Sequence, residues 1–111
     1  MRNQNVLNES FNQSIIDLVW QKATVVPGYD SNVYRKDHCG AWIKKSMHGN
    51  ANPLSMGWEI DHIKPKSIEK NDELSNLQPL QWENNKGKSD DYPKWLCTVT
   101  SDGNLKNKYI I

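Results

Sequence analysis

The chain has 111 residues, a length that suits one domain with one modest hydrophobic core, so residues 1–111 are predicted to form a single domain. Only 36% of the residues are hydrophobic, and no run approaches the roughly 18 apolar residues of a membrane span. The net charge of +1 excludes a polyanion binder that works through overall charge alone.

The N-terminal part predicts a polar start followed by one helix. Residues 1–9 are polar and are expected to fray. Apolar residues at helical spacing predict a helix over 11–22, with Ser10 or Asn12 as its cap. The helix is expected to end before the turn signal at 27–28, Pro-Gly.

The central part predicts two strands and a second helix. The stretches AWIKKSMH (41–48) and MGWEIDHI (56–63) read as the strands of a hairpin. A polar loop over 66–78 follows, and Pro79 is well placed as the first residue of a helix. At the C-terminus, WLCTVT and LKNKYII flank SDGN, which predicts a second hairpin. The predicted fold class is α+β.

The two cysteines, Cys39 and Cys97, lie far apart and form no CxxC pair that would hold zinc. The first ten residues, MRNQNVLNES, contain no apolar signal-peptide core. We therefore expect a cytoplasmic protein with two reduced thiols, and no structural zinc. A disulfide is the alternative, if the protein is exported.

Local charge is more informative than net charge. Residues 35–66 contain six basic and three acidic side chains, and further lysines follow at 86, 88 and 94. A basic surface around a small acidic centre suits a polyanion that is bound together with a metal ion. The alternative is an ordinary solvated, lysine-rich surface.

An acid and a histidine stand side by side in WEIDHIKP, where the second predicted strand ends before Pro65. Imidazole accepts a proton near neutral pH, and a carboxylate is a hard ligand for Mg²⁺ or Mn²⁺. We expect the strand's alternation to break here, so that Asp61 and His62 approach one reacting group. The alternative is two unrelated surface side chains on opposite faces.

Three elements follow one another over residues 59–90, EIDHIKPKSIEKNDELSNLQPLQWENNKGKSD. They are the pair Asp61-His62, then Asn76 fourteen residues after His62, then NNKGK, with Asn85 nine residues after Asn76. This combination resembles the HNH endonuclease family, and the resemblance extends over roughly residues 33–97. It implies a ββα-metal fold that cuts phosphodiester bonds with one divalent ion, here flanked by the N-terminal helix and the C-terminal hairpin.

By this resemblance, His62 is the general base, and Asp61 and Asn85 hold one Mg²⁺ or Mn²⁺ ion. Asn84 is the alternative ligand, but neighbours on a helix point about 100° apart, so only one of them faces the metal. Asn76 ties down the loop that orients His62. Lys86 and Lys88 contact phosphates, and the planar fork of donors on Arg35 also suits a phosphate.

The implied activity is metal-dependent hydrolysis of DNA, with RNA as an alternative substrate, leaving 5′-phosphate and 3′-hydroxyl ends. One site nicks one strand, so a double-strand break needs a homodimer or two events, and a targeting partner would supply specificity. Many relatives carry CxxC pairs for zinc, which this chain lacks. Two other functions stay open: a nucleic-acid-binding module without catalysis, and an interaction protein stabilised by metal.

Overall fold

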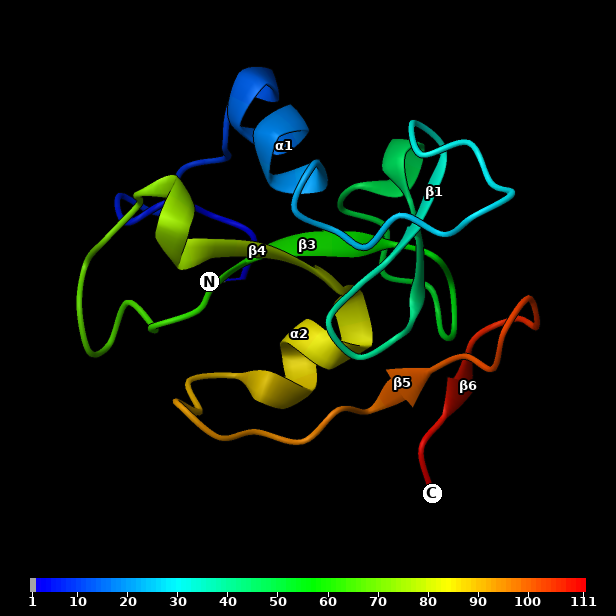
Figure 1. Cartoon of the computed structure of the whole chain (residues 1–111). Helices are drawn as coiled ribbons and strands as arrows, with labels where there is room; N and C mark the ends of the chain where they lie inside the picture. The colour runs from blue at the N-terminus through cyan, green and yellow to red at the C-terminus, as the bar shows by residue number, and fades with distance from the viewer. Residues whose placement is uncertain (1) are drawn as a thin grey trace.

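The computed structural model describes residues 2–111, which form a small α+β fold of two helices and three short antiparallel strand pairs. Figure 1 shows the pair β3–β4 in the middle, between α1 on one side and α2 on the other. In the described range, no helix has the length and apolar character needed to cross a bilayer. In chain order the elements are α1 (Gln13–Trp20), β1 (Tyr34–Lys36), β2 (Trp42–Lys44), η1 (Lys45–Met47), β3 (Trp58–His62), η2 (Leu74–Asn76), β4 (Leu77–Gln81), α2 (Trp82–Lys88), β5 (Val99–Thr100) and β6 (Lys108–Tyr109).

The first helix and the C-terminal hairpin agree with the sequence predictions. Asn12 caps α1 by accepting a hydrogen bond from the Ile15 backbone N–H. Strands β5 and β6 pair antiparallel around the predicted turn. The buried face of α1 packs on β3 and β4, in a core whose largest side chains are Trp20 and Trp58.

The predicted pairing of the central strands was wrong. β2 pairs with β1, and β3 pairs with β4, a strand that replaces the predicted start of the second helix. Pro79 lies in β4 opposite Ile60, whose backbone N–H turns away from β4 and donates to Asn3 Oδ1 at 2.8 Å. Ile60–Pro79 is thus a non-hydrogen-bonded pair of the antiparallel ladder. The pairing of β3 with β4 therefore requires no backbone N–H at Pro79.

The expected fraying of residues 1–9 was also wrong for the described residues 2–9, which we call the N-terminal arm. Asn3 Oδ1 accepts the Ile60 N–H and contacts His48 Nε2 at 2.9 Å. The Lys66 ammonium donates to the backbone oxygens of Gln4 and Asn5. The arm follows the β3–β4 pair toward the end of β3 (Figure 1). Long-range polar contacts, which a local sequence pattern does not reveal, hold it there.

His48, which helps to hold the arm, gives a pH prediction. Burial lowers the pKa of the His48 ring below its usual value near 6.5. The folded chain then binds this proton less readily than the unfolded chain, so stability falls as the pH drops below about 6.5 and levels off below the lowered pKa. His48→Gln is expected to reduce this loss in urea unfolding at neutral and mildly acidic pH. An unchanged pH dependence in the variant would contradict the assignment.

The expectation of reduced thiols was wrong, because Cys39 and Cys97 form a disulfide. The turn after β1 brings Cys39 beside the segment that leads into β5, although 58 positions separate the two cysteines. The thiol argument for a cytoplasmic location therefore falls away, and that location stays a prediction.

Replacing both cysteines by serine is expected to lower the free energy of unfolding by about 2–4 kcal/mol, because the unfolded chain gains the entropy of an open loop. Urea unfolding of the variant and of the parent, with and without reductant, measures this. Equal midpoints for the oxidised parent and the variant would show that the bond does not stabilise the fold.

Candidate active site

A cavity of about 350 Å³ lies where β3 ends. Asp61 and His62 line it from β3, Asn85 and Lys86 from α2, and Arg2 from the N-terminal arm. The order β3, β4, α2 folds the end of one strand against the second half of a short helix. Residues separated by more than twenty positions thereby share one cavity.

Asp61 and His62 reach this cavity without the predicted break in alternation, because β3 stays regular through His62, which pairs with Leu77. Asp61 faces α2, where its Oδ2 pairs with the Lys88 ammonium at 3.3 Å. His62 lies on the α1 side, with its ring centroid 6.0 Å from that of Phe11. The cavity extends around the end of the strand, so both faces contribute to it.

The Asp61 carboxyl is buried, and one of its two oxygens is engaged by protein donors. Burial raises the pKa of Asp61, while a hydrogen bond from Gln78 and the charge of Lys88 oppose that rise. Both partners bind Oδ2, with Gln78 Nε2 at 2.9 Å and Lys88 Nζ at 3.3 Å. No donor among residues 2–111 reaches Oδ1. Oδ1 is therefore the oxygen that can bind a ligand.

Asn85 is oriented by Glu59. Its Nδ2 donates to Glu59 Oε1 at 3.0 Å, and the same oxygen pairs with Arg2 Nε at 3.1 Å. An ionised carboxylate only accepts hydrogen bonds, so the amide atom of Asn85 that faces Glu59 must be the nitrogen. Asn85 Oδ1 has no donor within the described range and is left as a ligand atom.

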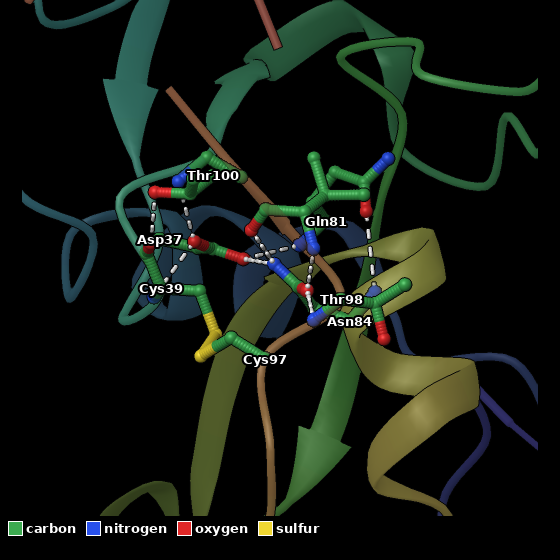
Figure 2. The surroundings of a disulfide bond; sticks show 9 residues. Asp37, Cys39, Gln81, Asn84, Cys97, Thr98 and Thr100 are labelled. Atoms are coloured by element: carbon green, nitrogen blue, oxygen red, sulfur yellow. Dashed lines mark hydrogen bonds between the residues drawn. A yellow bond between two sulfur atoms is a disulfide. The ribbon is translucent and has the colours of Figure 1, made fainter. Parts of the chain in front are cut away.

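Asn84 has a different environment, although it is the neighbour of Asn85. Its Nδ2 donates to Asp37 and to the Val99 carbonyl, and its Oδ1 accepts the N–H groups of Thr98 and Val99. Figure 2 shows its side chain facing Asp37 near the disulfide. Of the two asparagines, only Asn85 lines the cavity. The geometry therefore favours Asn85 over Asn84 as the ligand.

His62 contacts the loop after β3 through one ring nitrogen. Nε2 lies 2.8 Å from Asp72 Oδ1, and no hydrogen bond from residues 2–111 engages Nδ1. Asn76 organises the same loop. Its Oδ1 accepts the Lys64 N–H, and its Nδ2 donates to the carbonyls of Lys64 and Asn71. Within residues 2–111, the hydrogen bonds of the Asn76 side chain therefore all go to backbone groups of this loop.

Two predicted phosphate ligands are corrected by their surroundings. The Arg35 side chain is buried, and its guanidinium donates to the carbonyls of Ser31, Gln21 and Ala23. The Lys88 side chain is 1% exposed, and its ammonium pairs with Asp61 and donates to the His62 carbonyl. A phosphate cannot approach cations that the protein already encloses. Lys86, by contrast, is exposed at the cavity.

Sequence reasoning missed the residues that orient the site, namely Glu59, Asp72 and Gln78. Gln78 lies opposite Asp61 in the β3–β4 register, so recognising β4 would have placed it there. Glu59 lies two residues before Asp61, on the same face of the strand, which was a usable signal. Nothing local marks Asp72, because its role depends on the path of the loop.

The donor atoms fit a hard divalent ion. Asp61 Oδ1 and Asn85 Oδ1 are oxygen atoms available at one cavity, as Mg²⁺ and Mn²⁺ prefer. The described chain contains no group of three or more His, Cys, Asp or Glu side chains that could hold a metal. An ion here would therefore have one carboxylate and one amide as protein ligands, and would keep several waters, as Mg²⁺ commonly does.

Comparison with known protein families finds a match over the segment that carries the cavity residues of β3 and α2. The sequence profile of HNH endonucleases matches residues 50–94, which include β3, β4, α2 and the three cavity residues Asp61, His62 and Asn85. The chain has no significant match among curated proteins or among solved structures. This match, which covers less than half of the chain, supports the HNH endonuclease family and suggests a nuclease-type function.

Proposed function

We propose that this protein is a metal-dependent endonuclease that hydrolyses phosphodiester bonds of DNA, with β3, β4 and α2 as a ββα-metal core. The observation that carries the proposal is the shared cavity of Asp61, His62 and Asn85. Within residues 2–111, no donor reaches one atom of each of these side chains, namely an oxygen of Asp61, the oxygen of Asn85 and a ring nitrogen of His62. We treat residues 1–111 as one nuclease domain.

Asp61 Oδ1 and Asn85 Oδ1 would hold one Mg²⁺ or Mn²⁺ ion. When bound, such an ion stabilises the negative charge that develops on the phosphate and on the leaving oxygen. Lys88 and Gln78 keep Asp61 Oδ2 engaged, and so hold the carboxylate with Oδ1 toward the cavity. Glu59 does the same for the Asn85 amide.

His62 is the general base of the proposal. Because Asp72 occupies Nε2, Nδ1 is the nitrogen that accepts a proton from the attacking water. The water oxygen forms a bond to phosphorus as the bond from phosphorus to the 3′-oxygen breaks. The 3′-oxygen leaves with a proton from solvent, which gives 5′-phosphate and 3′-hydroxyl ends.

Lys86 is kept as a proposed phosphate contact, and Arg2 takes the place of Arg35 and Lys88. Arg2 uses only Nε in its bond to Glu59, and its side chain is 40% exposed at the cavity. Its two terminal nitrogens retain donors that suit phosphate oxygens. One cavity cuts one strand, so the proposed product is a nick unless two copies of the chain act together.

A plasmid assay tests the proposal. Supercoiled DNA is incubated with the protein in Mg²⁺, in Mn²⁺ and in EDTA, and nicked product is expected with either metal but not with EDTA. Intact DNA under all three conditions would contradict the DNA substrate, and RNA would be tested next. If both stayed intact while the folded protein still bound them, the non-catalytic binding module would be favoured.

Thermal unfolding distinguishes the proposed nuclease from the remaining candidate, an interaction protein stabilised by metal. An interaction protein stabilised by metal would unfold at a clearly lower temperature in EDTA. The proposed nuclease should lose activity in EDTA with little change in melting temperature, because neither proposed ligand, Asp61 or Asn85, belongs to the hydrophobic core cluster.

A further inference from the structure

The contact between His62 and Asp72 determines which ring nitrogen carries a proton. Asp72 Oδ1 lies 2.8 Å from His62 Nε2, and the Asp72 side chain is about one-third exposed, at 34%. An ionised carboxylate has no hydrogen to give, so Nε2 must be the donor. In the neutral ring the lone pair is then on Nδ1, the nitrogen that no side chain or backbone group of residues 2–111 engages.

Asp72 is itself held by the N-terminal arm. The Val6 backbone N–H lies 3.1 Å from both carboxylate oxygens of Asp72. The arm is fixed in turn to β3 by Asn3, which accepts the Ile60 N–H. The Asp72 carboxylate therefore accepts hydrogen bonds from Val6 in the arm and from His62 in the candidate site, although Asp72 itself belongs to a loop.

The ring is also bounded by an apolar neighbour. The ring centroid of Phe11 lies 6.0 Å from that of His62, at an interplanar angle of 37°. The His62 side chain is 6% exposed, so it has little room to turn. Packing thus limits the ring's position, while the hydrogen bond to Asp72 decides its protonation pattern.

We propose that Asp72 is a positioning residue that keeps the His62 proton on Nε2, and that the N-terminal arm holds Asp72 in place through the Val6 N–H. The inference rests on the proposed function for its catalytic meaning, but the tautomer itself can be observed without any reaction. It gives the arm a role in the site although the arm lies outside the segment that matches the family, residues 50–94.

Asp72→Asn is the main variant, because it keeps the shape and removes the charge. The new amide can donate to Nε2, which moves the ring proton to Nδ1 and removes the base. In a Ser-His-Asp triad the equivalent change lowers kcat by about 10⁴-fold. Here we expect kcat to fall by about 10²–10⁴-fold, with KM and Mn²⁺ affinity nearly unchanged. Asp72→Glu should recover part of the activity.

The deciding readout is the long-range ¹H–¹⁵N NMR spectrum of the His62 ring at mildly alkaline pH. The parent should show the Nε2–H tautomer, and Asp72→Asn should show a shift toward Nδ1–H. Glu69→Gln, in the same loop, is the matched control, because Glu69 pairs with Lys64 and not with His62. An Nε2–H tautomer that persists in Asp72→Asn with full kcat would overturn the proposal.

The arm is tested separately by Val6→Pro, which removes the backbone N–H, beside Val6→Ala, which keeps it. Val6→Pro should lower kcat in the same direction as Asp72→Asn but less, while Val6→Ala stays near the parent. Equal rates for the two would overturn the arm's role. If the parent cut no nucleic acid, the proposed function would fail, and the ring spectrum would still decide the role of Asp72.

Discussion

His62→Ala is expected to lower the rate of plasmid nicking by about 10²–10⁴-fold, the usual contribution of a general base. Of the three histidines in the chain, His62 is the one that lines the cavity. Its removal leaves Asp61 Oδ1 and Asn85 Oδ1 in place, so Mn²⁺ affinity should change little. Single-turnover nicking and calorimetric titration with Mn²⁺ measure the two effects separately.

His38→Ala is the matched control for this experiment. His38 is exposed, and its ring lies 5.8 Å from that of Trp95, away from the cavity. This variant should nick DNA at the parent's rate. A His62→Ala protein that was folded and equally active would show that another group serves as the base.

Alanine substitutions of the neighbouring Asn84 and Asn85, made one at a time, are expected to have different effects. One should abolish metal binding, and the other should lower the free energy of unfolding. Asn85→Ala should fold normally, lose measurable binding of Mn²⁺ and lose cleavage, because it removes one of two protein ligands. Asn84→Ala should bind metal when folded, but its free energy of unfolding should fall by about 3 kcal/mol. That loss reflects four hydrogen bonds of a fully buried amide, which join it to Asp37 and to the strand β5 segment.

Urea unfolding and Mn²⁺ titration of both variants measure this contrast. Each substitution removes one asparagine amide from α2, so each variant serves as the control for the other. If Asn84→Ala lost metal binding at full stability, the assignment of the two side chains would be reversed. If both variants kept parent-like metal affinity, the amide would not be a ligand at all.

The parts of the site that could be predicted from sequence are those set by short-range pattern. The strand that ends in Asp61-His62 and the helix that carries Asn85 follow from local signals and from the family resemblance. β4 was missed because Pro79 opposes a strand by propensity. Only the register, with Ile60 donating to the arm, shows why proline is tolerated there.

The remaining errors come from contacts between residues distant in sequence. Arg35 has the right chemistry for a phosphate, but the fold encloses it beneath the segment after α1. Arg2 was assigned to a fraying tail, yet it reaches Glu59 and lines the cavity. Lys88 lies on the buried side of a short helix and neutralises Asp61. The sequence shows which side chains are charged, but the tertiary fold determines which groups they pair with.

We propose that Asp61 and Asn85 hold one divalent ion beside His62. The most direct test is an anomalous difference map from crystals of the His62→Ala protein soaked in Mn²⁺. We expect one peak in the cavity, from an ion bound by Asp61 Oδ1 and Asn85 Oδ1 with water completing the coordination. A cavity without a peak at saturating Mn²⁺, or an ion bound elsewhere on the chain, would contradict it.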